Sequence, residues 1–204
     1  MERSGTGRLE AFSDGVFAIA ATLLVLEFTV NTGLDAPPLG HQLLHLWPAY
    51  LAYVTSFLTI GIIWINHHSV METVGRVDRT FMFVNTLLLL VVSFIPFPTR
   101  LVAEYLDKAG GGERAAVYAY DATLLLMALG FNVLWTYARR NRRLIGENVS
   151  EGAIRAITWA FRPGVPLYVL VLGVAIWSPL TSVILTLVLA AFYLPSAALF
   201  GRDD

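Results

Sequence analysis

The sequence contains no cysteine, which excludes disulfide bonds, thiolate metal sites and cysteine nucleophiles. Charge is also scarce, because Asp, Glu, Lys and Arg make up 14% of the 204 residues, against about 25% in a soluble domain. Hydrophobic residues make up 56%, and the mean hydropathy is +0.65. This composition predicts an integral, polytopic membrane protein with an all-α fold.

Motifs that carry enzyme chemistry are absent as well. Nothing in the chain resembles a nucleophile–base set, a phosphate-binding loop or a metalloprotease helix, so we expect no enzyme. The TVGYG motif, whose carbonyls form the filter of ordinary potassium channels, is also missing. Thr73-Val74-Gly75 matches its start, but Arg76 follows and the segment lies in an expected cytoplasmic loop. A channel with this sequence must therefore select ions by other means.

Six apolar runs are present, and helix-breaking residues separate them. The breakers include Asp35-Ala36-Pro37-Pro38, Gly110-Gly111-Gly112 and Trp177-Ser178-Pro179. An apolar helix of about 20 residues crosses the hydrocarbon core of a bilayer. The sequence therefore predicts one domain, residues 1–204, with transmembrane helices at roughly 9–30, 46–67, 81–102, 115–138, 164–177 and 180–200. The fifth run is short and contains Pro166, so its start stays open.

The positions of the basic residues predict the orientation of these helices. With the N-terminus inside, every Lys and Arg lies on the cytoplasmic side except Arg100, Lys108 and Arg114. Six crossings then place both termini in the cytoplasm. The first apolar run is too long for the core of a signal peptide and lacks a convincing cleavage site, so we expect it to remain as a span.

The first apolar run carries both an aliphatic stripe and a polar entrance. At 100° per residue, Ile19, Leu23, Leu26 and Val30 share one narrow helical face, with Thr22 at its margin. Such a stripe is typical of packing, of lipid contact or of a pore lining, and periodicity alone favours the first two. Asp14 points about 140° away from Ile19, so we expect the carboxylate and the stripe to face different neighbours.

Ionisable and amide side chains gather at the expected cytoplasmic ends of the first three spans. Buried polar groups at that depth need partners, and these residues could meet in one layer. The network either clamps helices together or acts as a proton relay or gate sensor; clamping is favoured because no ladder of carboxylates continues across the membrane. The set comprises Arg8, Ser13, Asp14, Asn66, His67, His68 and Asn85.

Two further motifs are weak indicators of a ligand. His67 and His68 lie 100° apart on a helix and cannot easily share a metal ion, while His41 and His45 have the favourable i, i+4 spacing but no carboxylate or cysteine nearby. We therefore expect no metal site. The basic run at residues 139–143 fits a nucleic-acid or anionic-lipid patch less well than a stop-transfer anchor, and we expect no nucleic-acid partner.

The pattern Arg8-x-x-x-Phe12-Ser13-Asp14, followed by GVFAIAATLLVLE, resembles the first helix of the transmembrane protein 175 family in its prokaryotic branch. The resemblance continues through Trp64-Ile65-Asn66-His67-His68 and into Asn85, and thins to hydropathy after about residue 100. Members of this family are potassium-permeable channels, and animal relatives reside in endosomes and lysosomes.

This resemblance implies a pore lined by the first helix of each subunit in a homotetramer. The positions that match the narrowing residues of the family are Ile19, Leu23 and Leu26, which would form the constriction. Thr22 would supply the hydroxyl group nearest to it. It also implies a network that ties the first helix to the next two, to which we assign Arg8, Phe12, Ser13, Asp14, His67, His68 and Asn85.

The resulting interpretation is a cation channel of the bacterial plasma membrane with a modest preference for potassium over sodium. We expect potassium ions to be the permeant species. The expected partners are the lipid bilayer and further copies of the chain, and we expect no cofactor. The alternative is a proton-coupled secondary transporter that uses Asp14, His67 and His68. Transporters usually contain internal repeats and broken helices at the bilayer midplane, and the first span has no internal proline.

Overall fold

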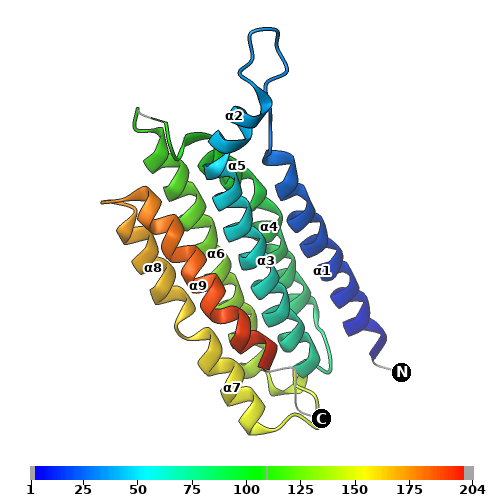
Figure 1. Ribbon diagram of the computed structural model, residues 1–204. Helices are drawn as coiled ribbons and strands as arrows, with labels where there is room; N and C mark the ends of the chain where they lie inside the picture. The colour runs from blue at the N-terminus through cyan, green and yellow to red at the C-terminus, as the bar shows by residue number, and fades with distance from the viewer. Residues whose placement is uncertain (1–2, 109, 200–204) are drawn as a thin grey trace.

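The computed structural model describes residues 3–108 and 110–199, and within them every regular element is a helix apart from one isolated bridge, between Val74 and Ile145. Figure 1 shows the helices as one elongated bundle. In chain order they are α1 (Arg3–Leu23), η1 (Leu24–Glu27), α2 (Leu39–His45), α3 (Trp47–Thr73), α4 (Arg79–Phe94), α5 (Pro96–Tyr105), α6 (Gly112–Arg140), η2 (Arg142–Leu144), α7 (Glu151–Phe161), α8 (Gly164–Val174) and α9 (Pro179–Leu199). The expected all-α fold is confirmed.

Among the described residues, five helical stretches are long and apolar enough to cross a bilayer. α4 and α5 together form one of them, because the chain stays helical through Ile95 and Pro96 begins α5. The segment Pro179–Tyr193 of α9 is apolar but shorter. The five stretches are Gly5–Glu27, Trp47–Thr73, Arg79–Tyr105, Gly112–Arg140 and Glu151–Val174.

The second long helix extends further than the sequence indicated. α3 continues to Thr73, beyond the expected end at residue 67, because no glycine or proline interrupts it between Gly61 and Gly75. His67 and His68 therefore lie within α3 and do not close it. This extra length places side chains of α3 beside the start of α1.

The first long helix ends earlier than expected. α1 stops at Leu23 and continues as a single 3-10 turn, η1, to Glu27. Val30, which the helical arithmetic placed on the face of Leu26, lies beyond both elements. The expected stripe is therefore shorter by one position.

The fifth helical stretch begins well before the expected residue 164. α7 starts at Glu151, and the hydroxyl of Ser150 caps it by accepting a hydrogen bond from the N–H of Ala153 at 3.1 Å. Pro163 separates α7 from α8, because proline cannot donate a helical hydrogen bond. Arg155, which the sequence interpretation placed in a loop, lies within α7.

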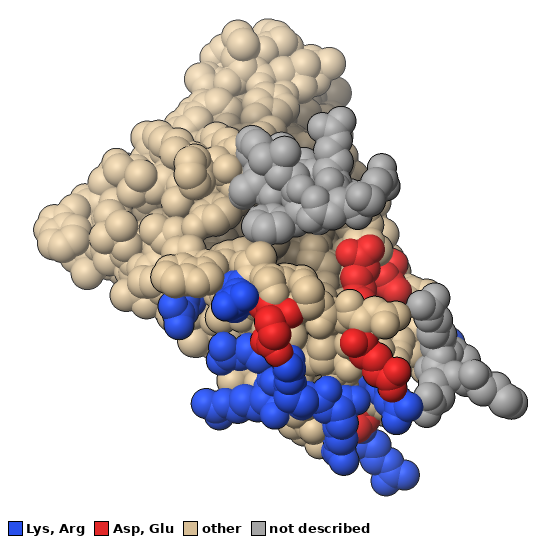
Figure 2. Space-filling view, turned by 90° about the horizontal axis from the view of Figure 1, so that it is seen from below, with Lys and Arg blue, Asp and Glu red and all other residues tan. Residues whose placement is uncertain are grey.

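The packing of the bundle leaves α1 at one edge. α1 contacts α3 and α4, whereas α8 and α9 cover the opposite side of the bundle. α1 begins and α9 ends at the same, lower end in Figure 1. Viewed from that end, Lys and Arg gather in one region, with Asp and Glu beside them (Figure 2). We call it the basic end; it is the end for which the basic residues predict a cytoplasmic position.

Asp78 joins α4 to the end of α6 at the basic end. Its carboxylate accepts hydrogen bonds from the N–H of Phe81 and the hydroxyl of Tyr137, each at 2.8 Å, and Nη2 of Arg143 lies 3.3 Å away. These donors, the Phe81 N–H above all, hold the pKa of Asp78 below its ordinary value. The start of α4 is thereby fixed against α6.

Candidate functional site

The face of α1 and η1 that points away from the bundle is aliphatic. Ile19 is 61% exposed, Leu23 40% and Leu26 67%. On a regular helix, Leu23 and Leu26 each point within about 40° of the direction of Ile19. Thr22 is also exposed, and its hydroxyl donates to the carbonyl of Ile19 at 3.0 Å. We call Ile19, Thr22, Leu23 and Leu26 the α1 stripe.

The other face of α1 is packed into the protein. Phe17, Ala20 and Leu24 are each at most 2% exposed, and α1 contacts α3 and α4 along its length. Burying this face fixes the rotation of the helix about its own axis. The α1 stripe is consequently directed outward, where lipid or another subunit must cover it.

A buried chain of three polar side chains anchors this packed face. The amide nitrogen of Asn85 (α4) donates to the hydroxyl of Ser13 (α1) at 3.0 Å, and the Ser13 hydroxyl donates to the carbonyl of Leu9 at 2.8 Å. Nε2 of His67 (α3) lies 2.8 Å from Oδ1 of Asn85. Ser13, Asn85 and His67 have no exposed surface. Because an amide oxygen only accepts, His67 carries a proton on Nε2.

A second set of polar contacts joins α1 to α3 at the surface. The indole N–H of Trp64 donates to Oδ1 of Asp14 at 2.9 Å. Nδ1 of His68 lies 2.9 Å from Oε1 of Glu10, and its Nε2 lies 3.4 Å from Oε1 of Glu72. The structure thus divides the expected single layer into a buried chain and an exposed set, and it adds Trp64 and Glu10, which the sequence interpretation did not include.

Two residues assigned to the network lie outside it. Arg8 is exposed, and no hydrogen bond or ion pair among the described residues involves it. It is six residues from Asp14, about 120° around the helix, so the two side chains diverge. Phe12 is 58% exposed and lies two turns before Ile19 on the same face. Phe12 therefore extends the α1 stripe toward the basic end.

An ion-pair cluster lies at the other end of α1. Glu27 closes η1, and its Oε2 lies 3.8 Å from Nε of Arg100 in α5; the same nitrogen donates to Oε1 of Glu104 at 2.9 Å. The Glu27 side chain is 12% exposed. α1 is thus held by polar contacts at both ends of its membrane crossing, to α3 and α4 at one and to α5 at the other.

A buried carboxyl group in α6 was missed by the sequence interpretation. Asp121 is fully buried, and the hydroxyl oxygen of Ser182 (α9) lies 2.6 Å from its Oδ2 and 2.9 Å from the carbonyl of Val171 (α8). A hydroxyl has one hydrogen, so both contacts are hydrogen bonds only when Asp121 is protonated and donates to Ser182. The sequence signal that could have identified it is the single acidic residue within the apolar run 115–138.

The histidines of α2 lie side by side, and among the described residues no further ligand joins them. Nε2 of His41 and Nε2 of His45 lie 3.0 Å apart at an exposed position, and no group of three or more His, Cys, Asp or Glu suited to a metal ion occurs in the part of the chain that the structure describes. Two imidazoles are fewer than the three or four protein ligands of ordinary zinc sites.

Comparison with known proteins identifies the architecture. A family model described as "Endosomal/lysosomal potassium channel TMEM175" matches residues 8–96. A potassium channel of Chamaesiphon minutus is 44% identical over 194 residues, which cover 94% of this chain and 95% of that protein. An endosomal/lysosomal proton channel TMEM175 of Gallus gallus is 33% identical over 144 residues, or 67% of this chain and 28% of that longer protein.

A solved structure supports the same assignment. The crystal structure of a lysosomal potassium-selective channel TMEM175 homolog from Chamaesiphon minutus matches with a TM-score of 0.85 and 42% identity, covering 95% of this chain and 98% of that one. The family expected from the residues of the first span is confirmed. The chain therefore belongs to the TMEM175 family, whose members are ion channels and not enzymes.

Proposed function

We propose that this protein is a potassium channel, modestly selective over sodium, in which the α1 stripe of each subunit lines and narrows the pore. The observation that carries this proposal is the outward-facing row of Ile19, Leu23 and Leu26 on a helix whose other face is buried. The names of the relatives, a potassium channel and a potassium-selective channel, support it. The membrane is that of a bacterial cell, with both termini in the cytoplasm.

The proposed constriction selects without a carbonyl filter. Rings of aliphatic side chains form a narrow apolar passage that closes by losing its water. A cation that crosses it must shed part of its hydration shell, and potassium releases water more readily than sodium. Discrimination on this basis is modest. Thr22 offers the nearest hydroxyl, although its hydrogen is already donated to the backbone.

Several copies of the chain are needed to close such a pore. One stripe cannot surround an ion, and α1 lies at the edge of the bundle, where a neighbouring subunit has access to it (Figure 1). Closed cyclic symmetry is the usual solution for identical subunits, and we propose a homotetramer. Ser13, Asn85 and His67 then have a positioning role, because they hold the rotation of α1 that keeps the stripe on the axis.

Substitution of the stripe tests the proposal. Ile19→Asn places an amide in the constriction, so we expect water to enter it and the potassium-to-sodium permeability ratio to fall toward one. Val133→Asn, at a 54% exposed aliphatic position of α6, is the matched control and should leave the ratio unchanged. Bilayer recordings of both variants measure it. An unaltered ratio in Ile19→Asn, or an equal fall in the control, would refute a pore at the stripe.

The alternative is proton-coupled transport through Asp14, His67 and His68. The relative from Gallus gallus, which is named a proton channel, supports this alternative. The contacts instead favour a structural role in which these residues hold the helices together. Asp14 is hydrogen-bonded to Trp64 and His67 to Asn85, so Asp14 and His67 belong to separate sets of contacts. Asp14→Asn distinguishes the two functions: we expect conduction to persist, whereas a transporter would lose it.

A further inference from the structure

A cavity of about 100 Å³ lies between α3, α6, α8 and α9, close to the junction with α7 and away from α1. Its walls are mostly apolar and carry no charged side chain. Ile63, Phe131 and Phe161 are buried, whereas Leu167 and Tyr193 are partly exposed, so the cavity opens on one side. An enclosed space of about 150 Å³ holds benzene; this one holds the inner part of a molecule of that size.

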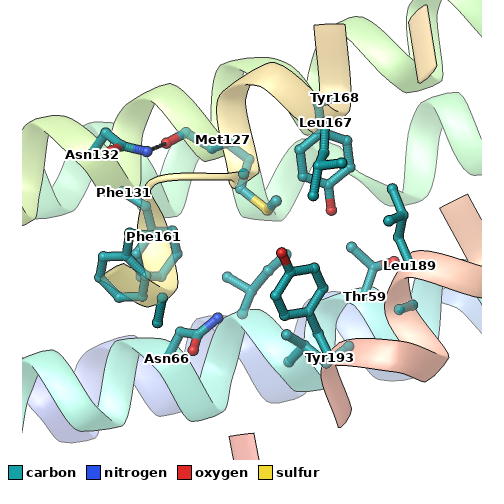
Figure 3. Close-up of a pocket in the computed structure, with 16 residues that line it drawn as sticks. Thr59, Asn66, Met127, Phe131, Asn132, Phe161, Leu167, Tyr168, Leu189 and Tyr193 are labelled. Atoms are coloured by element: carbon teal, nitrogen blue, oxygen red, sulfur yellow. Dashed lines mark hydrogen bonds between the residues drawn. The ribbon is translucent and has the colours of Figure 1, made fainter. Parts of the chain in front are cut away.

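Polar groups face into this apolar space. Figure 3 shows the amide of Asn66 and the hydroxyl ends of Tyr168 and Tyr193 directed toward the same hollow. Among the described residues, no hydrogen bond involves the side chain of Asn66 or the hydroxyl of Tyr168. Asn66 is half-buried, and an amide that faces apolar walls without a hydrogen-bond partner costs free energy. A ligand that brings a hydroxyl group would offset that cost.

Asn66 is separate from the polar contacts that position α1. It is followed directly by His67 and His68, which contact Asn85 and Glu10 respectively. On α3, the residues that face the cavity, Thr59, Ile63 and Asn66, lie roughly opposite those that face α1. Asn66 therefore faces the cavity, whereas His67 and His68 contact Asn85 and Glu10.

We propose that the cavity binds a small neutral phenol drawn from the bilayer, with its hydroxyl on Asn66 and Tyr168 and its ring against the aromatic wall formed by Phe131 and Phe161, whose rings pack edge to face with their centroids 5.6 Å apart. The absence of charged lining residues favours a neutral ligand. A lipid acyl chain would fill the space but leave the Asn66 amide without a partner. Water would satisfy the amide but lies against mostly apolar walls.

The test uses two probes of equal shape, 4-fluorophenol and 4-fluorotoluene, which differ by a hydroxyl in place of a methyl group. Binding to the full-length protein in lipid nanodiscs is followed by fluorine NMR, with empty nanodiscs as the reference for partition into lipid. We expect saturable binding of 4-fluorophenol, and binding of 4-fluorotoluene weaker by about tenfold, because the toluene leaves the amide unsatisfied.

Two variants locate the site. Asn66→Leu removes the amide at similar size and should weaken 4-fluorophenol binding by about tenfold, while Ala160→Leu fills the cavity and should abolish it. Val133→Leu, on the exposed face of α6, is the control. Equal affinity for the two probes would show an apolar occupant, and no saturable binding would show a water-filled space; each result overturns the proposal. If Asn66→Leu does not fold, the probe pair and Ala160→Leu still decide.

Discussion

Two of the places where the bundle buries polar side chains are built differently. Near the basic end, Ser13, Asn85 and His67 form a continuous hydrogen-bonded chain across α1, α4 and α3. Between α6, α8 and α9, Asp121 has one partner side chain, Ser182, and its Oδ1 has none among the described residues. The Ser13–Asn85–His67 group holds α1, a helix with one exposed face. Asp121 and Ser182 lie between α6, α8 and α9, which pack against one another.

This difference indicates what each group contributes. α1 packs mainly on α3 and α4 through one buried face, so the Ser13–Asn85–His67 chain adds to the apolar contacts that hold its rotation, and its loss should loosen the orientation of the α1 stripe. α6 is packed against α4, α5, α8 and α9, so Asp121 adds little to an orientation that apolar packing already determines. We expect disruption of the first group to alter conduction, and disruption of the second to leave it unchanged.

The largest effect is expected for Asn85→Leu. The substitution leaves the Nε2–H of His67 buried without an acceptor and removes the donor to Ser13, at a cost of about 3 kcal/mol in the free energy of unfolding. Thermal unfolding in detergent and bilayer recording measure the stability and the selectivity of the variant. Thr86→Val, an exposed position on the same helix, is the control. Unchanged selectivity in a folded Asn85→Leu protein would contradict the claim that the Ser13–Asn85–His67 chain affects conduction.

An intermediate effect is expected for Asp78, a carboxylate with ample donors at the edge of the membrane. Asp78→Ala removes the cap of α4 and should cost about 1–2 kcal/mol, whereas Asp78→Asn retains a capping oxygen and should cost less. Because folding lowers the pKa of Asp78, its contribution is complete above its ordinary pKa of about 4 and declines as the pH falls below that value.

Unfolding of the wild type and of Asp78→Ala across pH measures this contribution. The stability difference should be constant near neutral pH and shrink in acid. A difference that grows in acid would contradict the assigned partners, since it would mean that the protonated carboxyl group is the favoured form.

The smallest effect is expected for Asp121→Asn. The amide has the shape of a protonated carboxyl group and can donate to Ser182, so the change in stability should stay below about 1 kcal/mol, with conduction unaltered. Infrared difference spectroscopy should show that the variant loses the carbonyl band of a protonated carboxylic acid. Loss of a carboxylate band would instead show that Asp121 is ionised and would contradict the hydrogen-bond directions assigned to Ser182.

The face of the first helix could be predicted from the sequence because helical periodicity needs no tertiary information. The arithmetic that grouped Ile19, Leu23 and Leu26 also separated them from Asp14, and the structure keeps both relations. Ser13, Asn85 and His67 were grouped because unpaired polar groups are costly in a bilayer. The family was recognisable from Arg8 to Glu27, a stretch within residues 8–96 that the family model matches.

The remaining contacts depended on helix ends and partners that local patterns do not define. The extension of α3 to Thr73 and the start of α7 at Glu151 are set by packing and by the Ser150 cap, and hydropathy does not register either. Trp64 entered the sequence interpretation as part of the family pattern, yet it donates to Asp14. Asp121 was overlooked because a single charge barely lowers the hydropathy of a 29-residue helix.

The most direct test of the account is the reversal potential of the purified wild-type protein in planar bilayers, with potassium on one side and sodium on the other. A pore lined by the α1 stripe predicts unitary currents that reverse toward the potassium equilibrium potential. Slow flux without unitary events, or a reversal potential that follows an imposed pH gradient, would contradict the channel and would assign transport to Asp14 and the histidines.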